Sequence, residues 1–213
     1  MISTKNAELI NIDKKLETAI NKAKKYYLEG TVFIYPTDTI YGFGANPFNE
    51  DAVKRIDAIK GRDEGKPYIL LVDSVDTLTK YVDIKNEKHL DFLLAIWPNP
   101  VSVVLNLNKK TQSILKQNTA AFRVPHQRFC LKLLDQIKMP LISTSVNRSD
   151  MEPLSEISMI IDNFISEVDA IFYTEKRSYF KASTLIDLSD SFPVLLREGP
   201  LAGDRDRAES HQP

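Results

Sequence analysis

The sequence predicts an α/β fold in which helices cover a mixed β-sheet. Segments with a strand pattern alternate with segments of helical period along most of the 213 residues, an order typical of such folds. Two continuous apolar runs, residues 31–35 and 68–72, are typical of strands that are buried on both faces. Short strands close to the C-terminus favour a mixed sheet over a purely parallel one.

Each expected element follows from a residue pattern. Helical periodicity indicates helices over residues 16–27, 50–60, 90–96, 129–137 and 157–164, with a further helix beginning near Ser74. Continuous or alternating apolar residues indicate strands over residues 31–35, 68–72, 101–108, 120–124, 141–142, 170–173, 183–188 and 194–197. One domain of residues 1–201 is expected. Residues 202–213 are polar and charged and are expected to form a disordered tail.

Polar residues follow the strand of residues 31–35. Pro36 cannot donate to a sheet ladder, so the strand is expected to end there and lead into a loop. That loop carries two hydroxyls and a carboxylate, from Thr37, Asp38 and Thr39. Gly42 and Gly44 allow close backbone approach or positive φ, so the loop is expected to wrap around a ligand. Asn49 then caps the next helix.

Composition restricts the kind of ligand and the setting. The 28 Lys and Arg residues balance 29 Asp and Glu residues, so the formal charge of −1 provides no global attraction for nucleic acid or membranes. The single cysteine, Cys130, excludes an internal disulfide framework and is expected to be buried. No apolar run reaches the roughly 18 residues of a membrane span, and the charged start lacks a signal-peptide core. A soluble, cytoplasmic protein is expected.

Cations lie beside the ends of several expected elements. Lys60 and Arg62 follow a helix, where cations are also favoured for ordinary electrostatic reasons. Arg123 lies in an apolar strand and needs a buried partner or a ligand. The hydroxyls of residues 143–145 and the amide of Asn147 are, by composition alone, turn and cap residues. Together, the cations and hydroxyls indicate an anionic ligand with planar or phosphate groups.

Other kinds of site lack support in the sequence. His89, His126 and His211 are scattered without the spacing of metal ligands, so no metal bound by the protein itself is expected and each is expected at the surface. No Walker loop or dinucleotide fingerprint is present. Ser145 lacks both a nucleophile-elbow sequence and an identifiable base, which argues against a serine nucleophile.

Seven blocks stand out in order along the chain: Pro36-Thr37-Asp38-Thr39-Ile40-Tyr41-Gly42, Lys60-Gly61-Arg62, Trp97-Pro98-Asn99-Pro100, Arg123-Val124-Pro125, Ser145-Val146-Asn147, Ser183-Thr184 and Arg197. Together they resemble the threonylcarbamoyl-AMP synthase family (TsaC/YrdC). The resemblance runs from about Thr31 to Leu201. Any one block would be weak evidence, whereas seven in order are strong.

The resemblance implies a single-domain, YrdC-like twisted mixed sheet flanked by helices, with a concave ligand cleft, in the short form without the extra C-terminal domain. It implies a nucleotidyltransferase that joins L-threonine, bicarbonate or CO2, and ATP into threonylcarbamoyl-adenylate and pyrophosphate. This is the first step toward N6-threonylcarbamoyladenosine in tRNA. Mg2+ carried by the nucleotide would share the pyrophosphate charge. The implied partners are downstream tRNA threonylcarbamoyl-transferase proteins, and weak RNA binding stays open.

The resemblance also assigns residues to roles. The family's signature tetrad around the phosphates and the carbamoyl group corresponds to Lys60, Arg62, Ser145 and Asn147. The positions that hold threonine correspond to Thr37, Thr39, Arg123, Ser143 and Ser183. The positions that hold ATP correspond to Arg62, Lys66, Thr119, Ser145 and Arg197. The chain departs from the family pattern, which has a small residue, a glycine and a proline, at Val146, Asp150 and Glu198.

Two other functions are compatible with the fold. A paralogue could bind nucleotide or double-stranded RNA without making the adenylate, but retention of the tetrad argues against it. A carbamoyl-transfer module could use carbamoyl phosphate, as hydrogenase maturation proteins do. The zinc-finger-like and acylphosphatase-like segments of those proteins have no counterpart beside this domain.

Overall fold

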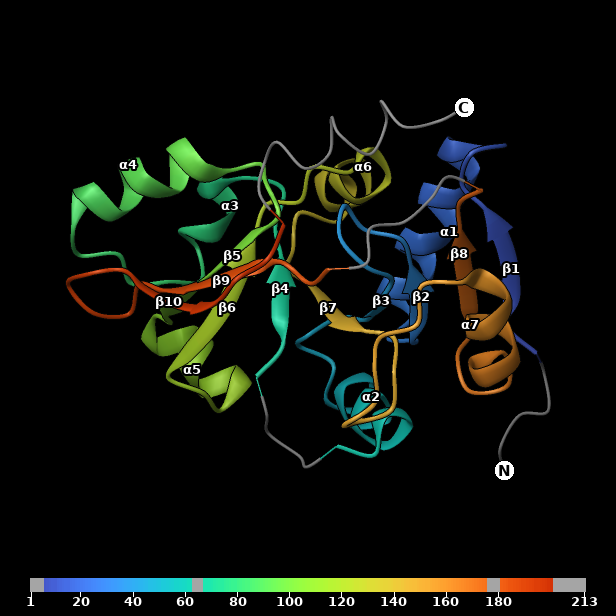
Figure 1. Cartoon of the computed structure of the whole chain (residues 1–213). Helices are drawn as coiled ribbons and strands as arrows, with labels where there is room; N and C mark the ends of the chain where they lie inside the picture. Colours follow the sequence, from blue (N-terminus) through green and yellow to red (C-terminus); the bar gives the residue numbers. More distant parts are fainter. Residues whose placement is uncertain (1–5, 63–66, 176–180, 201–213) are drawn as a thin grey trace.

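The computed structural model describes residues 6–62, 67–175 and 181–200, which form an α/β fold around one mixed sheet (Figure 1). The strands are β1 (Glu8–Asn11), β2 (Phe33–Tyr35), β3 (Gly42–Gly44), β4 (Ile69–Leu71), β5 (Val101–Asn106), β6 (Thr119–Arg123), β7 (Leu141–Ser145), β8 (Ala170–Tyr173), β9 (Thr184–Asp187) and β10 (Val194–Arg197). The helices are α1 (Leu16–Leu28), α2 (Glu50–Lys60), α3 (Val75–Leu78), α4 (Glu87–Ile96), α5 (Lys109–Leu115), α6 (Arg128–Ile137) and α7 (Ile157–Phe164).

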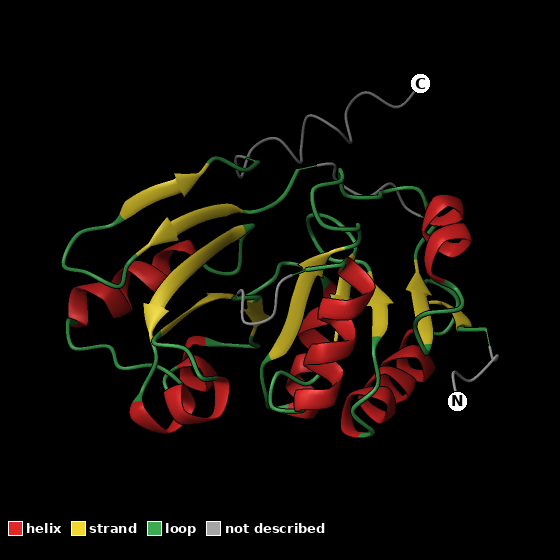
Figure 2. Cartoon of the chain, turned by 90° about the horizontal axis from the view of Figure 1, so that it is seen from below, coloured by secondary structure: helices red, strands yellow, loops and turns green. Residues whose placement is uncertain are grey.

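The described residues build a ten-stranded sheet in the order β1-β8-β2-β3-β7-β4-β6-β5-β9-β10. The pairs β1–β8, β2–β8, β4–β6 and β5–β9 are parallel, and the other neighbouring pairs are antiparallel. Figure 2 shows the strands crossing the molecule with helices packed alongside. The mixed sheet that the sequence predicts is therefore confirmed.

The two faces of the sheet carry separate apolar clusters. On β2, Phe33 and Tyr35 belong to the cluster that also contains the buried residues of α1 and α6. Ile34, between them, belongs to the other cluster, with the buried apolar residues of α2 and α7. Because successive side chains of a strand point to opposite faces, a continuous apolar run indicates burial on both sides. None of the described helices is both long and apolar enough to cross a membrane.

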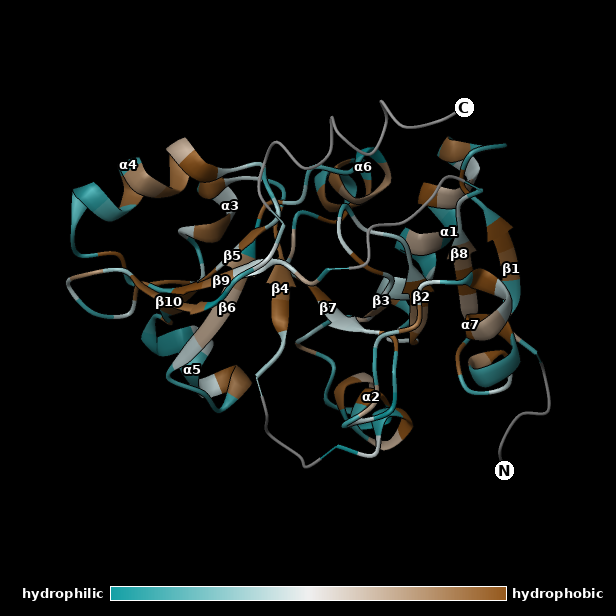
Figure 3. Ribbon diagram, viewed as in Figure 1, coloured by the Kyte–Doolittle hydropathy of each residue, from teal (hydrophilic) through white to brown (hydrophobic). Residues whose placement is uncertain are grey.

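Two segments that the sequence suggested were loop or turn are strands. Residues 42–44, expected to wrap around a ligand, form β3 and pair with both β2 and β7. The hydroxyl residues expected in a turn continue β7 to Ser145. In Figure 3, β4 is brown along its length, whereas the end of β7 is pale. Polar side chains on a central strand hide the strand signal, because they face a cleft rather than an apolar layer.

Two further elements were not predicted. Strand β1 is at the edge of the sheet, and Glu8 and Leu9 in it are exposed, so its pattern is weak. Of the residues of helix α5, only Thr111 is buried, and the helix therefore lacks a helical apolar period. The expected helix near Ser74 is the four-residue α3, which Ser74 caps through the backbone N–H of Thr77.

Gly44 fills a place where a side chain does not fit. A Cβ atom there would lie 2.6 Å from a ring atom of Phe33 and 2.7 Å from one of Tyr35. Both rings are fully buried, and the Tyr35 hydroxyl donates to the Ile142 carbonyl at 3.0 Å, so neither ring can move freely. The glycine thus serves packing between strands rather than a ligand loop.

Gly44→Ala is expected to lower the free energy of unfolding by about 1–3 kcal/mol, the usual range for overpacking a filled core. Urea denaturation measures the change. Gly61→Ala is the matched control: a Cβ atom there meets nothing within 4 Å, and the strain comes from φ of 61° alone. A Gly44→Ala variant as stable as the parent chain would contradict the packing argument.

Candidate active site

A cleft of about 470 Å³ opens where the turn after β2 meets strands β4, β6, β7, β9 and β10. Seven of the predicted site residues line it: Thr39, Thr119, Arg123, Ser143, Ser145, Ser183 and Arg197. Among the described lining residues the charged ones are Arg123 and Arg197, and none is acidic. A cleft with two cations and several hydroxyls suits an anionic ligand.

Arg123 is held by a buried carboxylate. Its side chain is 3% exposed, and its Nη1 lies 3.5 Å from Asp38 Oδ1 and donates to Thr39 Oγ1 at 3.1 Å. Asp38 also accepts from the backbone N–H of His126 through Oδ2, at 3.0 Å. The expectation that Arg123 needs a buried partner is confirmed. Among the described residues, however, Asp38 Oδ1 and Arg123 Nε have no hydrogen-bond partner.

Arg197 and Ser183 also line the cleft. Arg197 donates through Nε and Nη2 to the Ser183 carbonyl, at 3.1 and 2.9 Å. The Ser183 hydroxyl lies 2.8 Å from the Ser102 hydroxyl. Burial, and next the charge of Arg123, lower the pKa of Arg197 below its ordinary value. The two guanidinium groups therefore repel each other, and a bound anion would relieve this repulsion.

Lys60 holds the segment that follows β7. Its ammonium donates to the Ser145 carbonyl at 2.6 Å, the Asn147 carbonyl at 3.1 Å and Asn147 Oδ1 at 2.8 Å. The Ser145 hydroxyl donates to the same Asn147 Oδ1 at 2.6 Å. Three of the four tetrad residues thus form one network, although Lys60 and Asn147 lie behind the cleft wall rather than on it.

Arg62 lies at the turn that ends α2. Gly61, with φ of 61°, allows the Arg62 backbone N–H to donate to the Asp57 carbonyl at 3.0 Å. The guanidinium stacks over the ring of Tyr68 at 4.7 Å, and its Nη2 donates to the Pro67 carbonyl at 3.1 Å. Tyr68 and Pro67 line the cleft, so Arg62 lies just outside its edge.

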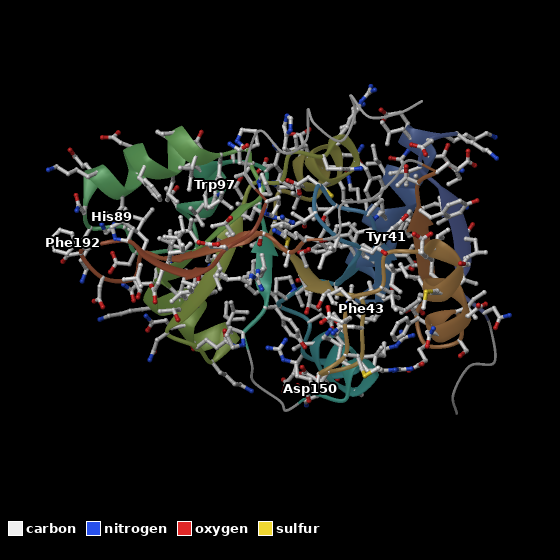
Figure 4. All side chains as sticks on the ribbon, in the orientation of Figure 1. Tyr41, Phe43, His89, Trp97, Asp150 and Phe192 are labelled. Atoms are coloured by element: carbon white, nitrogen blue, oxygen red, sulfur yellow. The ribbon has the colours of Figure 1, made fainter. Side chains whose placement is uncertain are left out.

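The remaining predicted residues lie elsewhere. Thr37 is buried in the turn, where its hydroxyl donates to the Ile40 carbonyl at 2.7 Å and lies 3.0 Å from Thr39 Oγ1. Thr37 is therefore behind Thr39 rather than on the cleft wall. Lys66 lies outside the described residues, as do His211 and residues 202–213. His126 is exposed and His89 half-buried, and Figure 4 shows His89 with Phe192 at one end of the molecule, away from Tyr41.

The departures from the family pattern are accommodated by the fold. Val146 is fully buried in the main core. Asp150 has φ of 63°, the left-handed region where glycine is favoured and Asp is tolerated better than most residues. The loop containing Asp150 lies beside α2, and the backbone N–H of Ser149 donates to the Lys60 carbonyl at 2.6 Å (Figure 4). Glu198 is exposed.

Sequence reasoning missed three residues of this site. Asp38 was seen in the polar loop but received no role, although a buried Arg in an apolar strand required a counter-charge. Tyr68 was absorbed into an apolar run, and no sequence signal marked its ring as the partner of Arg62. Ser102 lies on β5, in an alternating pattern that placed its side chain on the polar side.

Burial, and next the charge of Arg62, lower the pKa of Lys60 to about 8. The unfolded chain keeps the Lys60 proton up to a pKa of about 10.4. Between these values the unfolded chain binds more protons than the native protein, so the contribution of Lys60 to stability rises with pH.

Comparing the parent chain with Lys60→Met is expected to reveal this titration. From pH 8 to 9.5, the free energy of unfolding of the parent chain should rise relative to that of Lys60→Met by up to about 1.4 kcal/mol per pH unit. Urea denaturation at several pH values measures the difference, and titrations common to both proteins, such as that of Cys130, cancel. Parallel pH profiles for the two proteins would contradict the lowered pKa.

The arrangement suits positioning and charge neutralisation rather than covalent catalysis. The lining hydroxyls offer directional hydrogen bonds, and the two guanidinium groups offer charge and planar forks for carboxylate or phosphate oxygens. Across residues 6–62, 67–175 and 181–200, no three His, Cys, Asp or Glu side chains come together as a metal site would require.

Known proteins resemble this chain in sequence and in structure. A family model, Sua5/YciO/YrdC, described as "Telomere recombination", matches residues 25–199. A threonylcarbamoyl-AMP synthase of Pyrococcus abyssi (strain GE5 / Orsay) is 30% identical over 196 residues, which are 91% of this chain and 58% of that protein. The chain thus spans less than two thirds of that relative.

Solved structures with 27–30% sequence identity share the fold, and two of them illustrate the likeness. The crystal structure of Pyrococcus abyssi Sua5 complexed with L-threonine has a TM-score of 0.83 and 30% identity, covering 94% of this chain and 60% of that one. The crystal structure of E. coli YciO has a TM-score of 0.80 and 27% identity, covering 92% of this chain and 96% of that one.

Proposed function

The chain belongs to the Sua5/YciO/YrdC family, and from this membership and the cleft we propose that it is an L-threonylcarbamoyladenylate synthase. It joins L-threonine, bicarbonate or CO2, and ATP into threonylcarbamoyl-AMP and pyrophosphate, and so acts as a nucleotidyltransferase. The Pyrococcus relative bears the name of this activity, and the Sua5 structure was solved with L-threonine.

One observation carries the proposal: a single cleft is lined by two arginines and several hydroxyls. Arg123, which donates to Thr39, and Ser143 offer partners for the carboxylate and hydroxyl of a small amino acid. Arg197 and Thr119 line the same cleft and offer charge and a hydroxyl to a nucleotide. Both substrates of the reaction can therefore occupy one continuous space.

In the proposed reaction, the main task of the protein is to orient the substrates. The threonine nitrogen forms a bond to the carbon of CO2 and loses a proton, which gives a carbamate. A carbamate oxygen then attacks the α-phosphorus of ATP, and the bond to pyrophosphate breaks. Arg62 and Arg197 neutralise phosphate charge, while Lys60 fixes Ser145 and Asn147 beside the reacting groups.

The proposal also covers the metal ion and the cellular compartment. Mg2+ enters with ATP and is held by the phosphates, since the described residues provide hydroxyls and cations at the cleft rather than carboxylates. The product passes to tRNA threonylcarbamoyl-transferase proteins, which places the enzyme in the cytoplasm with its substrates. Thr37 supports threonine binding through Thr39, whose hydroxyl lies 3.0 Å from its own, and Lys66 keeps its proposed role in nucleotide binding.

Pyrophosphate release by the purified chain tests this function. With ATP and Mg2+ present, L-threonine and bicarbonate are added separately and then together, and release is expected to require both. The adenylate product is identified by mass spectrometry. If protein that circular dichroism shows to be folded releases no pyrophosphate in any mixture, the result would instead favour a nucleotide-binding paralogue without synthase activity.

A further inference from the structure

Arg62, a member of the tetrad that the family resemblance assigns to catalysis, makes few contacts within the described residues. Among the described residues its guanidinium makes one hydrogen bond, from Nη2 to the Pro67 carbonyl, and its buried Nε has no hydrogen-bond partner. Within the described part of the chain it also contacts the ring of Tyr68, whose centroid lies 4.7 Å from the guanidinium carbon. An arginine side chain has many rotamers, so this stack is the main restraint on where its charge lies.

The ring of Tyr68 is itself fixed by a buried carboxylate. The Tyr68 hydroxyl donates to Asp57 Oδ1, and Asp57 is 5% exposed. Burial, and next the hydrogen bond to Asp57, raise the pKa of Tyr68 well above its ordinary value, so the phenol stays protonated and keeps donating. The carboxylate draws the phenol proton and makes the ring a better partner for a cation.

The turn at Gly61 brings Arg62 close to Asp57, the residue that holds the Tyr68 hydroxyl. The Arg62 backbone N–H donates to the Asp57 carbonyl, so the two residues lie side by side at the end of α2. Tyr68 directly precedes β4 and lines both the cleft and a second cavity, which Asp57 also lines. Tyr68 therefore lies where the two spaces adjoin.

We propose that Tyr68, anchored by Asp57, is a positioning residue that holds the Arg62 guanidinium at the edge of the cleft by stacking. This rests on the proposed function, in which Arg62 neutralises nucleotide phosphate. Tyr68 contributes through Arg62 and forms no hydrogen bond to the nucleotide through its hydroxyl, which Asp57 occupies. Loss of the ring releases Arg62 into many rotamers.

The first test needs no ligand. In a ¹⁵N–¹H spectrum of the free protein, the Arg62 Nε–Hε signal is assigned by its loss in Arg62→Ala. It is expected upfield of exposed arginines, because of the ring current of Tyr68, and protected from solvent exchange. Tyr68→Phe should keep the upfield shift and Tyr68→Leu should abolish it. An Arg62 signal unchanged in Tyr68→Leu would overturn the proposal.

The second test is a double-mutant cycle on affinity for α,β-methylene-ATP, measured by calorimetry. Tyr68→Leu is expected to weaken binding by about tenfold, and Tyr68→Phe by much less. In the Arg62→Ala background, Tyr68→Leu should have no further effect. Equal losses in both backgrounds would overturn the proposal, because the ring would then act on the nucleotide directly.

Phe164→Leu is the matched control. It removes the ring under another guanidinium, that of Arg148, at 4.6 Å, and should leave the Arg62 signal and nucleotide affinity unchanged. If Tyr68→Leu fails to fold, Tyr68→Met removes the ring with less loss of volume. A stacked Arg62 signal in a protein that binds no nucleotide would support the stacking geometry and overturn the proposed function.

Discussion

Arg123→Leu is expected to remove threonine binding, with affinity falling by about 100-fold or more, because a buried guanidinium is the proposed partner of the substrate carboxylate. The Arg123 side chain is 3% exposed and lines the cleft beside Thr39 and Ser143. Calorimetric titration with L-threonine measures the loss. Arg128→Leu, a change of an exposed arginine at the start of α6, is the matched control.

The Arg123→Leu variant is also expected to be less stable, and this effect must be separated from the loss of threonine affinity. Arg123→Leu leaves the Asp38 carboxylate buried without its counter-charge, which is expected to lower the free energy of unfolding by about 3–5 kcal/mol. The double variant Asp38→Asn/Arg123→Leu removes the orphaned charge and should recover most of that stability without recovering threonine affinity. A folded double variant that binds threonine as tightly as the parent chain would refute the role of Arg123.

Arg62→Ala is expected to slow adenylate formation by about 10³-fold, the scale on which a positioned cation stabilises charge in phosphoryl-transfer chemistry. Since Arg62 makes a single hydrogen bond and one stacking contact among the described residues, the free energy of unfolding should change by less than about 1 kcal/mol. The rate is followed by pyrophosphate release at saturating substrates.

Arg62→Lys separates charge from geometry in the same assay. Lysine keeps the positive charge but lacks the planar fork that stacks on Tyr68, so it should restore activity only in part. A near-normal rate for Arg62→Ala would remove Arg62 from the catalytic group, whatever its effect on folding.

The sequence predicted those elements that carry a clear apolar pattern, including β10, whose four residues are exposed. Strands β2 and β4 are apolar on both faces and were predicted within two residues, as was α2 with its Asn49 cap. Strand β3, with two glycines in three residues, carries no such signal, because its place in the sheet depends on the ring packing above Gly44. Short or polar elements are specified by their neighbours rather than by their own residues.

The site could be predicted from the sequence only where a residue's type and its surroundings in the chain demand a partner. The need of Arg123 for a partner follows from its residue type in an apolar strand, but the identity of Asp38 depends on how the turn after β2 folds back. The network of Lys60, Ser145 and Asn147 joins residues 85 and 87 positions apart. Spacing along the chain cannot show that these residues lie close together in space. The family resemblance grouped them, and the structure shows the hydrogen bonds among the three.

The position of β7 governs when the cleft can exist. This strand lies between β3 and β4, which precede it by many residues, and it carries Ser143 and Ser145 into the middle of the sheet. While the protein is being synthesised, β3 and β4 have no neighbour to join them until residues 141–145 have left the ribosome. The two flanking parts of the sheet must stay apart until then, so the cleft cannot begin to form earlier, and the part of it lined by Ser183 and Arg197 is synthesised later still.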